Sequence, residues 1–387
     1  MKLALLKGNR FNPWHLEAFN RLPETEVTGF RAESEVQARF DDRENGSLRF
    51  SIEPIYFDTQ TGAPWTRWMH RLSERFFGRA PRIAPFRERL AGFDVIQTWE
   101  LFTDWTAEAL AAKVRDGTPV AVMVWDNIPY NNEPNVRLRD MKRRAVASAD
   151  RFIVHTERSR RMLAIEGVDE SRIVKIDPGV DTEAFSPGPH TRGALGLGED
   201  ELVVLFVGWL LPRKGIDFLV LALRELLNDP AVKGRRIRLA IAGSGPGKER
   251  VESLIRRAGV GEHCTFIGPF SYEHMPGVFQ AADVFALPSI ATAGWQEQFG
   301  MSLIEAMACG VPVVTTQSGA IPEIVGEAGL ICQPNDFVSL HHALRELVLN
   351  SEQRDALADA GRQRAVDRFS LDDYVENLSA IYGALVG

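Results

Sequence analysis

The chain has 387 residues, of which 45% are hydrophobic and 25% are charged, a composition typical of a globular protein with about two domains. This composition excludes a disordered chain and a fibrous repeat, and three cysteines (Cys264, Cys309 and Cys332) are too few for a disulfide scaffold. The formal net charge of −7 argues against a general nucleic-acid-binding protein, which is normally basic.

The N-terminal residues MKLALLKG form too short an apolar run for a signal peptide and predict a first buried strand. Nowhere does the sequence approach the ~18 consecutive apolar residues that a membrane-spanning helix needs. We therefore expect a cytoplasmic protein that could still lie on the inner surface of a membrane.

Short apolar runs alternate with amphipathic stretches of helical length along most of the chain. Runs such as LVVLFV predict strands that are covered on both faces, as in parallel sheets. The predicted strands are Lys2–Leu6, Val95–Thr98, Val120–Val124, Arg151–Val154, Ile173–Ile176, Leu202–Val207, Arg238–Ala242, Cys264–Ile267, Val284–Leu287, Val313–Thr315 and Gly329–Ile331. The predicted helices are Thr106–Asp116, Arg137–Ala147, Ile216–Leu227, Lys248–Ala258, Ser302–Met307, Leu340–Leu349 and Leu371–Val386. Such alternation indicates βαβ units.

A stretch rich in proline and glycine, Asp177–Glu201, separates two periodic regions and predicts a linker between two domains. We place an N-terminal Rossmann-like domain at residues 1–185, the linker at 186–200 and a C-terminal Rossmann-like domain at 201–369. In sheets of this kind ligands bind beyond the carboxyl ends of the strands, so residues directly after strands are the candidates for function.

The first candidate segment is GWLLPRKGID, which follows the predicted strand LVVLFV. Arg213 and Lys214 stand just before a helix that begins near Ile216. Two cations beside the free N–H groups of a helix start could bind a phosphate, or they could be a solvated pair on a surface loop.

The second candidate segment is AGSGPGKE, after the strand RLAIA. The dinucleotide fingerprint fails because Lys248 stands where its third glycine is needed, and this disfavours a NAD-dependent dehydrogenase. The Walker pattern fails in spacing, and Glu249 replaces its Ser or Thr. A strand-to-helix turn without a direct catalytic role is the better interpretation.

The third candidate segment, PSIATAGWQEQFGMSLIEA, begins where the strand ending at Leu287 ends. Glu297 should lie on the loop and Glu305 one turn into the next helix, so that both could face one ligand. Backbone N–H groups from Gly300 to Leu303 would favour an anion there. Alternatively, Glu305 could simply offset the helix dipole.

This segment, with Glu297, seven residues and then Glu305, followed by AMACGVPVVTTQSGAIPEIVGEAG, resembles the signature of retaining glycosyltransferases of family 4. The segments VGWLLPRKGID, LAIAGSGPG, VGEHCTFIGPF and IDPGVDTEAFSP occur in the order and spacing of that family. The resemblance is dense over residues 150–370 and weak over 1–120. It implies the GT-B fold, in which two Rossmann-like α/β/α domains face a central cleft and the C-terminal helix, here 370–387, crosses back to the first domain.

The resemblance also implies residue roles. Glu305 would bind the ribose of a nucleotide sugar, Glu297 would hold hydroxyls of the transferred sugar, and Lys214 with Arg213 would neutralise the diphosphate. The donor would further contact the backbone at Phe270, Phe299, Gly300 and Met301, and Gly8 and Asn9 from the first domain. No metal cofactor is expected, because cations and a helix N-terminus supply the positive field.

Two positions depart from the usual pattern of the family. Trp209 stands where an arginine is common, so either Arg213 substitutes or the loop is placed differently. Trp125 stands before Asp126 where a histidine is common, and an indole cannot accept a proton. His155 ends the strand FIVH and could line the cleft, or it could be a buried, hydrogen-bonded histidine.

The segment Trp65–Arg89 is basic and carries Trp65, Trp68, Leu72 and Phe76 at helical spacing. It is either a membrane-surface helix or a solvated helix that packs on its own domain. If it contacts a membrane, a lipid-linked acceptor follows.

The resemblance thus implies a retaining transferase that moves a hexose from a UDP- or GDP-linked donor to a hydroxyl of a glycan, glycolipid or small molecule. Two alternatives stay open: a nucleotide-sugar 2-epimerase, and a non-catalytic sugar-binding protein. The sequence leaves the sugar, the base and the acceptor undetermined, because a few pocket contacts decide them.

Overall fold

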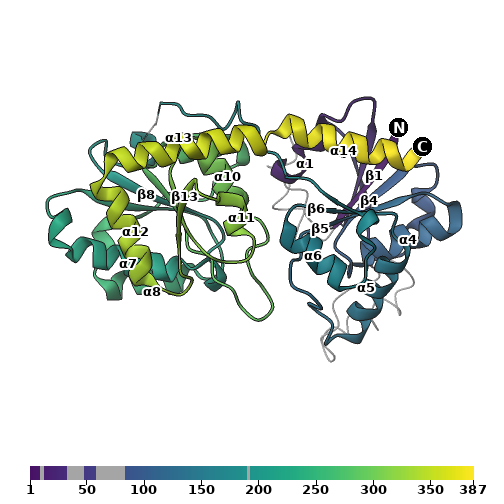
Figure 1. Ribbon diagram of the computed structural model, residues 1–387, viewed down its shortest axis with the longest axis horizontal. Coiled ribbons are helices and arrows are strands. Elements are labelled where there is room, and N and C mark those ends of the chain that lie inside the picture. The colour runs from purple at the N-terminus through teal and green to yellow at the C-terminus, as the bar shows by residue number, and fades with distance from the viewer. Residues whose placement is uncertain (9–12, 33–47, 58–82, 190–191) are drawn as a thin grey trace. The chain divides into compact units, whose positions relative to one another are not determined.

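The computed structural model describes residues 1–8, 13–32, 48–57, 83–189 and 192–387 (Figure 1). The chain forms two compact units. Unit 1 comprises Met1–His155, Ser159–Ile176 and Asp372–Gly387, and unit 2 comprises Thr156–Arg158 and Asp177–Leu371. The division at Ile176 precedes the linker expected at 186–200. The physical reason is that Arg362 of unit 2 binds the carbonyl oxygens of Thr182 and Phe185 at 3.0 and 2.9 Å.

Unit 1 contains a parallel sheet of seven strands in the order β3-β2-β1-β4-β5-β6-β7. The strands are β1 (Lys2–Gly8), β2 (Glu26–Ala32), β3 (Ser51–Ile55), β4 (Val95–Trp99), β5 (Val120–Val124), β6 (Arg151–Val154) and β7 (Ile173–Lys175). The helices are α1 (Pro13–Asn20), α4 (Asp104–Asp116), α5 (Val136–Ser148), α6 (Glu157–Ile165) and α14 (Leu371–Val386). The direction of winding reverses between β1 and β4, which therefore flank the topological switch point of this sheet.

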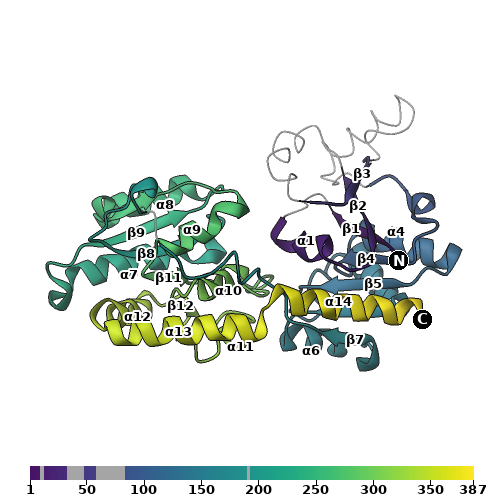
Figure 2. The same ribbon diagram turned by 90° about the horizontal axis from the view of Figure 1, so that it is seen from above.

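Unit 2 contains a parallel sheet of six strands in the order β10-β9-β8-β11-β12-β13, surrounded by helices (Figure 2). The strands are β8 (Leu202–Val207), β9 (Ile237–Ala242), β10 (Cys264–Phe266), β11 (Val284–Leu287), β12 (Val313–Thr316) and β13 (Gly329–Cys332). The helices are α7 (Ile216–Asn228), α8 (Lys248–Ala258), α9 (Met275–Gln280), α10 (Met301–Ala308), α11 (Ile321–Val325), α12 (Phe337–Leu349) and α13 (Ser351–Arg368). Here the reversal lies between β8 and β11.

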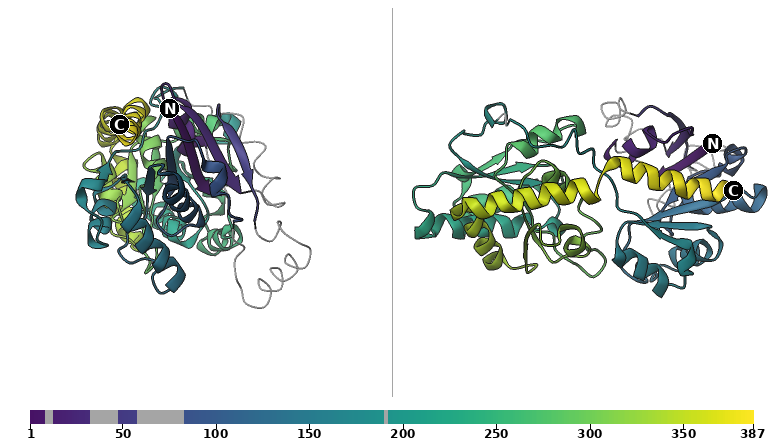
Figure 3. Two further views of the ribbon diagram at one scale, coloured as in Figure 1. Left: turned by 90° about the vertical axis from the view of Figure 1, so that its right-hand side faces the viewer. Right: turned by 45° about the horizontal axis from the view of Figure 1, so that its top comes forward.

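The helix α14 packs on unit 1, although it follows α13 of unit 2 directly in the chain (Figure 3). The hydroxyl of Tyr382 donates to Oε1 of Gln97 in β4 at 3.2 Å, and the Tyr374 hydroxyl lies 3.8 Å from the sulfur of Met123 in β5. Leu378 and Tyr382 are fully buried. The buried face of this helix thus covers the first sheet.

The predicted class of two Rossmann-like α/β domains is confirmed, since both sheets are parallel and their connections contain helices. No helix among the described residues is both long enough and apolar enough to cross a membrane.

Candidate active site

The loops after β8 and β11 touch at the switch point of unit 2, and a glycine makes this contact possible. Gly215 has a φ of 70°, and a Cβ atom there would lie 1.8 Å from the carbonyl oxygen of Pro288. The N–H of Ile290 donates to the carbonyl oxygen of Arg213 at 2.9 Å. The backbone therefore holds the predicted cation loop against the predicted carboxylate loop.

Lys214 and Glu297 form an ion pair at this junction. Nζ of Lys214 lies 2.8 and 3.1 Å from the two carboxylate oxygens of Glu297, and the hydroxyl of Ser289 donates to the same carboxylate at 2.6 Å. The two side chains of the pair are only 17% and 7% exposed. A lysine and a carboxylate that share this position can bind an anion and a hydroxyl side by side.

The backbone of Glu297 is held as firmly as its side chain. Its carbonyl oxygen accepts from the N–H of Ala320 at 3.0 Å. Gly319 has a φ of 56°, and a Cβ atom there would lie 2.0 Å from that same oxygen. Only glycine permits this approach, so the segment after β12 fixes the position of the carboxylate.

Arg213 stacks on an aromatic ring beside the ion pair. Its guanidinium carbon lies 4.2 Å from the ring centroid of Trp295, and Nζ of Lys214 lies 5.4 Å from the same ring. Burial lowers the pKa of Arg213 from its usual value, and the charge of Glu297 acts in the opposite direction. The aromatic platform keeps a second cation at the place where the sequence predicts an anion.

Glu305 lies on α10, while Glu297 lies on the loop, as predicted. Burial raises the pKa of Glu305 to about 7, and a hydrogen bond from the side chain of Tyr272 partly offsets this effect. The helix begins after Gly300, whose φ is 92°. Phe299 is buried and packs edge-on against Phe369, with ring centroids 5.8 Å apart. The first turn of α10, including Met301, thus starts from an anchored loop.

The loop Gly243–Gly247 lies against the segment after β8. Cβ atoms at Gly243 and Gly247 would lie 2.0 and 2.4 Å from the carbonyl oxygens of Gly208 and Leu210. The N–H of Leu210 donates to the carbonyl oxygen of Ser244 at 2.8 Å. Close backbone approach explains these glycines, and the loop is the predicted strand-to-helix turn. Phe270 lies on the loop after β10, two residues beyond Gly268, and is half-buried.

In unit 1, the predicted site residues lie at the carboxyl ends of β1, β5 and β6. Gly8 ends β1 with a φ of 101°, and Asn9 lies outside the described residues. Trp125 and Asp126 follow β5, and their backbone N–H groups donate to Oε1 of Glu100 at 3.0 and 3.3 Å. The predicted residues of unit 1 therefore lie together at the carboxyl ends of its own strands.

His155 is 1% exposed, and its Nδ1 lies 2.9 Å from the carbonyl oxygen of Ile176. Its ring packs against those of Trp125 and Tyr374, at centroid distances of 4.3 and 5.8 Å. This geometry fits the alternative of a buried, hydrogen-bonded histidine.

The predicted basic helix Trp65–Arg89 lies largely in 58–82, outside the described residues. Within the described part, Arg87 pairs with Glu108 at 3.0 Å and Arg89 with Glu53 at 2.5 Å. These two arginines are engaged within unit 1.

Two models of known protein families match the chain. The model described as Glycosyl transferases group 1 matches residues 189–364, and the model described as Glycosyltransferase Family 4 matches residues 41–184. The chain belongs to glycosyltransferase family 4. The resemblance read from the segments around Lys214, Glu297 and Glu305 is thereby confirmed.

Curated relatives of this family 4 protein include D-inositol 3-phosphate glycosyltransferases of Geodermatophilus obscurus, 34% identical over 262 residues, and of Mycolicibacterium smegmatis, 34% identical over 249 residues. These matches cover 65% and 62% of this chain and 56% and 54% of the relatives. The chain spans little more than half the length of the curated relatives that it matches.

Solved structures establish the fold of this family 4 protein. Anabaena HepE in complex with UDP has a TM-score of 0.77 at 17% identity, with 99% of this chain and 100% of that chain covered. Sucrose-phosphate synthase of Thermosynechococcus elongatus has a TM-score of 0.75 at 20% identity, with 100% and 99% covered. The predicted GT-B fold is confirmed.

Sequence reasoning missed several partners in the site. Ser289, Trp295 and Tyr272 contact the predicted residues, and nothing in their local sequence distinguishes them. Glu100 carries a detectable signal, because it is a charged residue two positions after the end of the predicted strand Val95–Thr98. The rule that led to Lys214 should have led to it as well.

Proposed function

We propose that the protein is a retaining hexosyltransferase that moves a hexose from a UDP- or GDP-linked donor to a hydroxyl of a glycan, a glycolipid or a small molecule. The observation that carries this proposal is the Lys214–Glu297 ion pair at the switch point of unit 2, beside Arg213 on Trp295. The relatives are named glycosyltransferases, and HepE was solved with UDP and with UDP-glucose.

In this proposal the donor binds at the carboxyl ends of β8 and β11. Lys214 and Arg213 stabilise the negative charge that grows on the diphosphate as it leaves. Glu297 accepts hydrogen bonds from the hydroxyls of the sugar, and Glu305 from the vicinal hydroxyls of the ribose. The first turn of α10, from Gly300 and Met301, adds backbone N–H donors to the anion. The reaction as proposed requires no metal ion.

The chemical step follows from these roles. The bond between the anomeric carbon and the phosphate oxygen breaks with oxocarbenium character, and the acceptor oxygen bonds to the same face of that carbon. The departing phosphate oxygen takes the proton of the acceptor hydroxyl, so no protein nucleophile takes part. The task of the protein is to hold both substrates and to stabilise the leaving group.

A binding panel tests the donor part of the proposal. Thermal shifts are measured with UDP, GDP, ADP and TDP and with their glucose or mannose conjugates. A nucleotide at ~100 times its Kd stabilises the fold by about 2.7 kcal/mol. A shift by none of these ligands contradicts a nucleotide-sugar donor.

Product analysis tests the reaction and separates the alternatives. An α-linked donor should give an α-linked product, read from the anomeric NMR coupling, and EDTA should leave the rate unchanged. Isomerisation of the donor without an acceptor would instead indicate a 2-epimerase. Sugar binding without any nucleotide requirement would indicate a sugar-binding protein. Inversion of the anomeric configuration would contradict the retaining mechanism.

A further inference from the structure

Glu100 lies at the topological switch point of unit 1 in an unusual backbone conformation. The last register pair of the two strands at this point is Leu6 with Thr98, so Gly8 and Glu100 each follow two residues beyond it. Glu100 has a φ of 61°, in the left-handed region that non-glycine residues rarely adopt. Its N–H donates to Met123 at 2.9 Å and its carbonyl oxygen accepts from Thr106 at 2.6 Å, and these bonds maintain the conformation.

The side chain of Glu100 has one engaged oxygen and one open oxygen. Oε1 accepts the backbone N–H groups of Trp125 and Asp126. Oε2 is buried and has no hydrogen-bond partner among the described residues. Buried carboxyl oxygens almost always have a partner, so an open one at a sheet edge points to a ligand.

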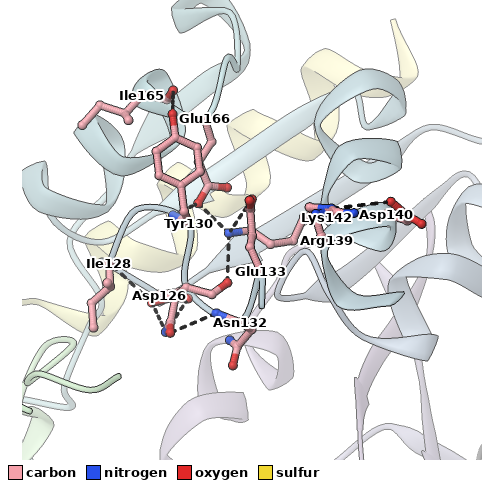
Figure 4. A network of polar contacts seen from close by, with 11 residues as sticks. Asp126, Ile128, Tyr130, Asn132, Glu133, Arg139, Asp140, Lys142, Ile165 and Glu166 are labelled. Carbon is pink, nitrogen blue, oxygen red and sulfur yellow. Dashed lines mark hydrogen bonds and ion pairs between the residues drawn. The ribbon is translucent and has the colours of Figure 1, made fainter. Parts of the chain in front are cut away.

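Two charged side chains act on the Glu100 carboxyl. Asp126 repels a negative charge there, while its own carboxylate accepts the N–H groups of Asn127 and Ile128 and the amide of Asn131. Lys142 acts weakly, because it is buried and bound to Glu166 at 2.5 Å in the network that holds the loop after β5 (Figure 4). Burial first and Asp126 second raise the pKa of Glu100 to about 8. Because Oε1 already accepts two N–H groups, a proton on this carboxyl would lie on Oε2 and present an O–H donor there.

We propose that Glu100 is a specificity-determining residue that binds a neutral hydroxyl of the acceptor at the switch point between β1 and β4. The negative charge of Asp126 disfavours a phosphate or carboxylate at this position, so the ligand group is an alcohol oxygen. Near the ends of the same two strands, Nζ of Lys7 lies 5.2 Å from the ring centroid of Trp99, and neither this atom nor Nε1 of Trp99 has a hydrogen-bond partner among the described residues. The inference rests on the proposed function, since it assigns part of the acceptor site.

Direct binding of small polyols tests this assignment. The probes are myo-inositol, glucose and D-inositol 3-phosphate, titrated by saturation-transfer NMR into the full chain with UDP present, at pH 7 and pH 9. Wild type is compared with Glu100→Ala, with Glu100→Gln and with the exposed carboxyl control Glu88→Gln. Glu100→Gln keeps an oxygen for the N–H groups of Trp125 and Asp126, so it separates ligand binding from support of the loop.

We expect at least one probe to bind wild type, with Kd raised about tenfold or more in Glu100→Ala. Between pH 7 and pH 9 the wild-type Kd should rise about tenfold, as the O–H donor is lost around pH 8, whereas in Glu100→Gln it should be independent of pH. Glu88→Gln should behave as wild type. If Glu100 had only a structural role, the Kd for the polyol would not depend on pH in this range.

The assignment is wrong if no probe binds, if folded Glu100→Ala binds as wild type does, or if the pH dependence persists in Glu100→Gln. Affinities for UDP and GDP, measured in the same samples, report on the proposed function. A protein that binds neither nucleotide contradicts the proposed function itself. A protein that binds a nucleotide but shows one of the three outcomes above contradicts the role of Glu100 alone.

Discussion

Removing the cation of the Lys214–Glu297 pair should lower both the stability of the protein and its kcat/KM, and a second substitution can then distinguish the two effects. In Lys214→Met, the carboxylate of Glu297, whose side chain is 7% exposed, loses both contacts to Nζ and keeps the hydroxyl of Ser289. Breaking a buried pair in this way costs about 3–5 kcal/mol, and we expect the lower end because Ser289 remains. If Lys214 stabilises the leaving diphosphate, kcat/KM should also fall by a factor of about 100, equivalent to about 2.7 kcal/mol.

The double variant Lys214→Met/Glu297→Gln makes the separation measurable. It leaves no buried charge unpaired, so urea unfolding should recover most of the lost stability, whereas kcat/KM stays low. Lys248→Met is the matched control, since Lys248 follows the neighbouring strand β9 and is exposed. It should change neither quantity appreciably. A folded Lys214→Met variant with near-wild-type turnover would remove Lys214 from the mechanism.

Two further predictions concern the scaffold and the pH dependence of stability. Gly319→Ala should lower the free energy of unfolding by about 3 kcal/mol or more, because its Cβ atom would collide with the carbonyl oxygen of Glu297. Gly261→Ala, where the added atom meets nothing within 4 Å, should be nearly neutral. Urea titrations of both variants test this difference. Because burial raises the pKa of Glu305 to about 7, its protonated form favours the folded state, and this stabilisation should be lost as pH rises from about 4.5 through 7. Glu305→Gln should flatten that part of the stability profile by up to about 3 kcal/mol, and an unchanged slope would show that Glu305 titrates normally.

Apolar periodicity predicted every strand buried at the centre of the two sheets, most within one residue of its observed ends. It missed β2 and β3 because their sequences, EVTGFRA and SIEPI, mix apolar residues with charges, glycine and proline. Pro54 is tolerated in β3 because this is an edge strand of the sheet. The helix α13 was missed because it buries only Gly361 and Ala365, which give almost no apolar contrast along the sequence.

The site was predictable as a set of positions after strands, but not as a set of contacts. The sequence motifs placed Lys214 and Glu297 correctly on their loops. Their ion pair joins residues 83 positions apart, and it depends on the approach of Gly215 to Pro288, which no local pattern encodes. Likewise, the contact between the backbone N–H of Trp125 after β5 and the carboxylate of Glu100 after β4 joins two loops, and neither loop's sequence indicates it.

The carboxyl groups at the two switch points have neighbours of opposite charge. In unit 2, Glu297 is balanced by a cation and a hydroxyl, so changing it to glutamine leaves Lys214 buried without its counterion. In unit 1, Glu100 has a neighbouring anion in Asp126, so the same change relieves repulsion. Glu297→Gln should therefore destabilise the protein, whereas Glu100→Gln should remove a destabilisation that grows as pH rises from about 4.5, where the unfolded carboxyl ionises, and is complete above about pH 8. Glu100 thus differs from Glu297 in a second way: its Oε1 accepts two backbone N–H groups, but its buried Oε2 has no hydrogen-bond partner among the described residues, as expected where a ligand supplies the missing partner.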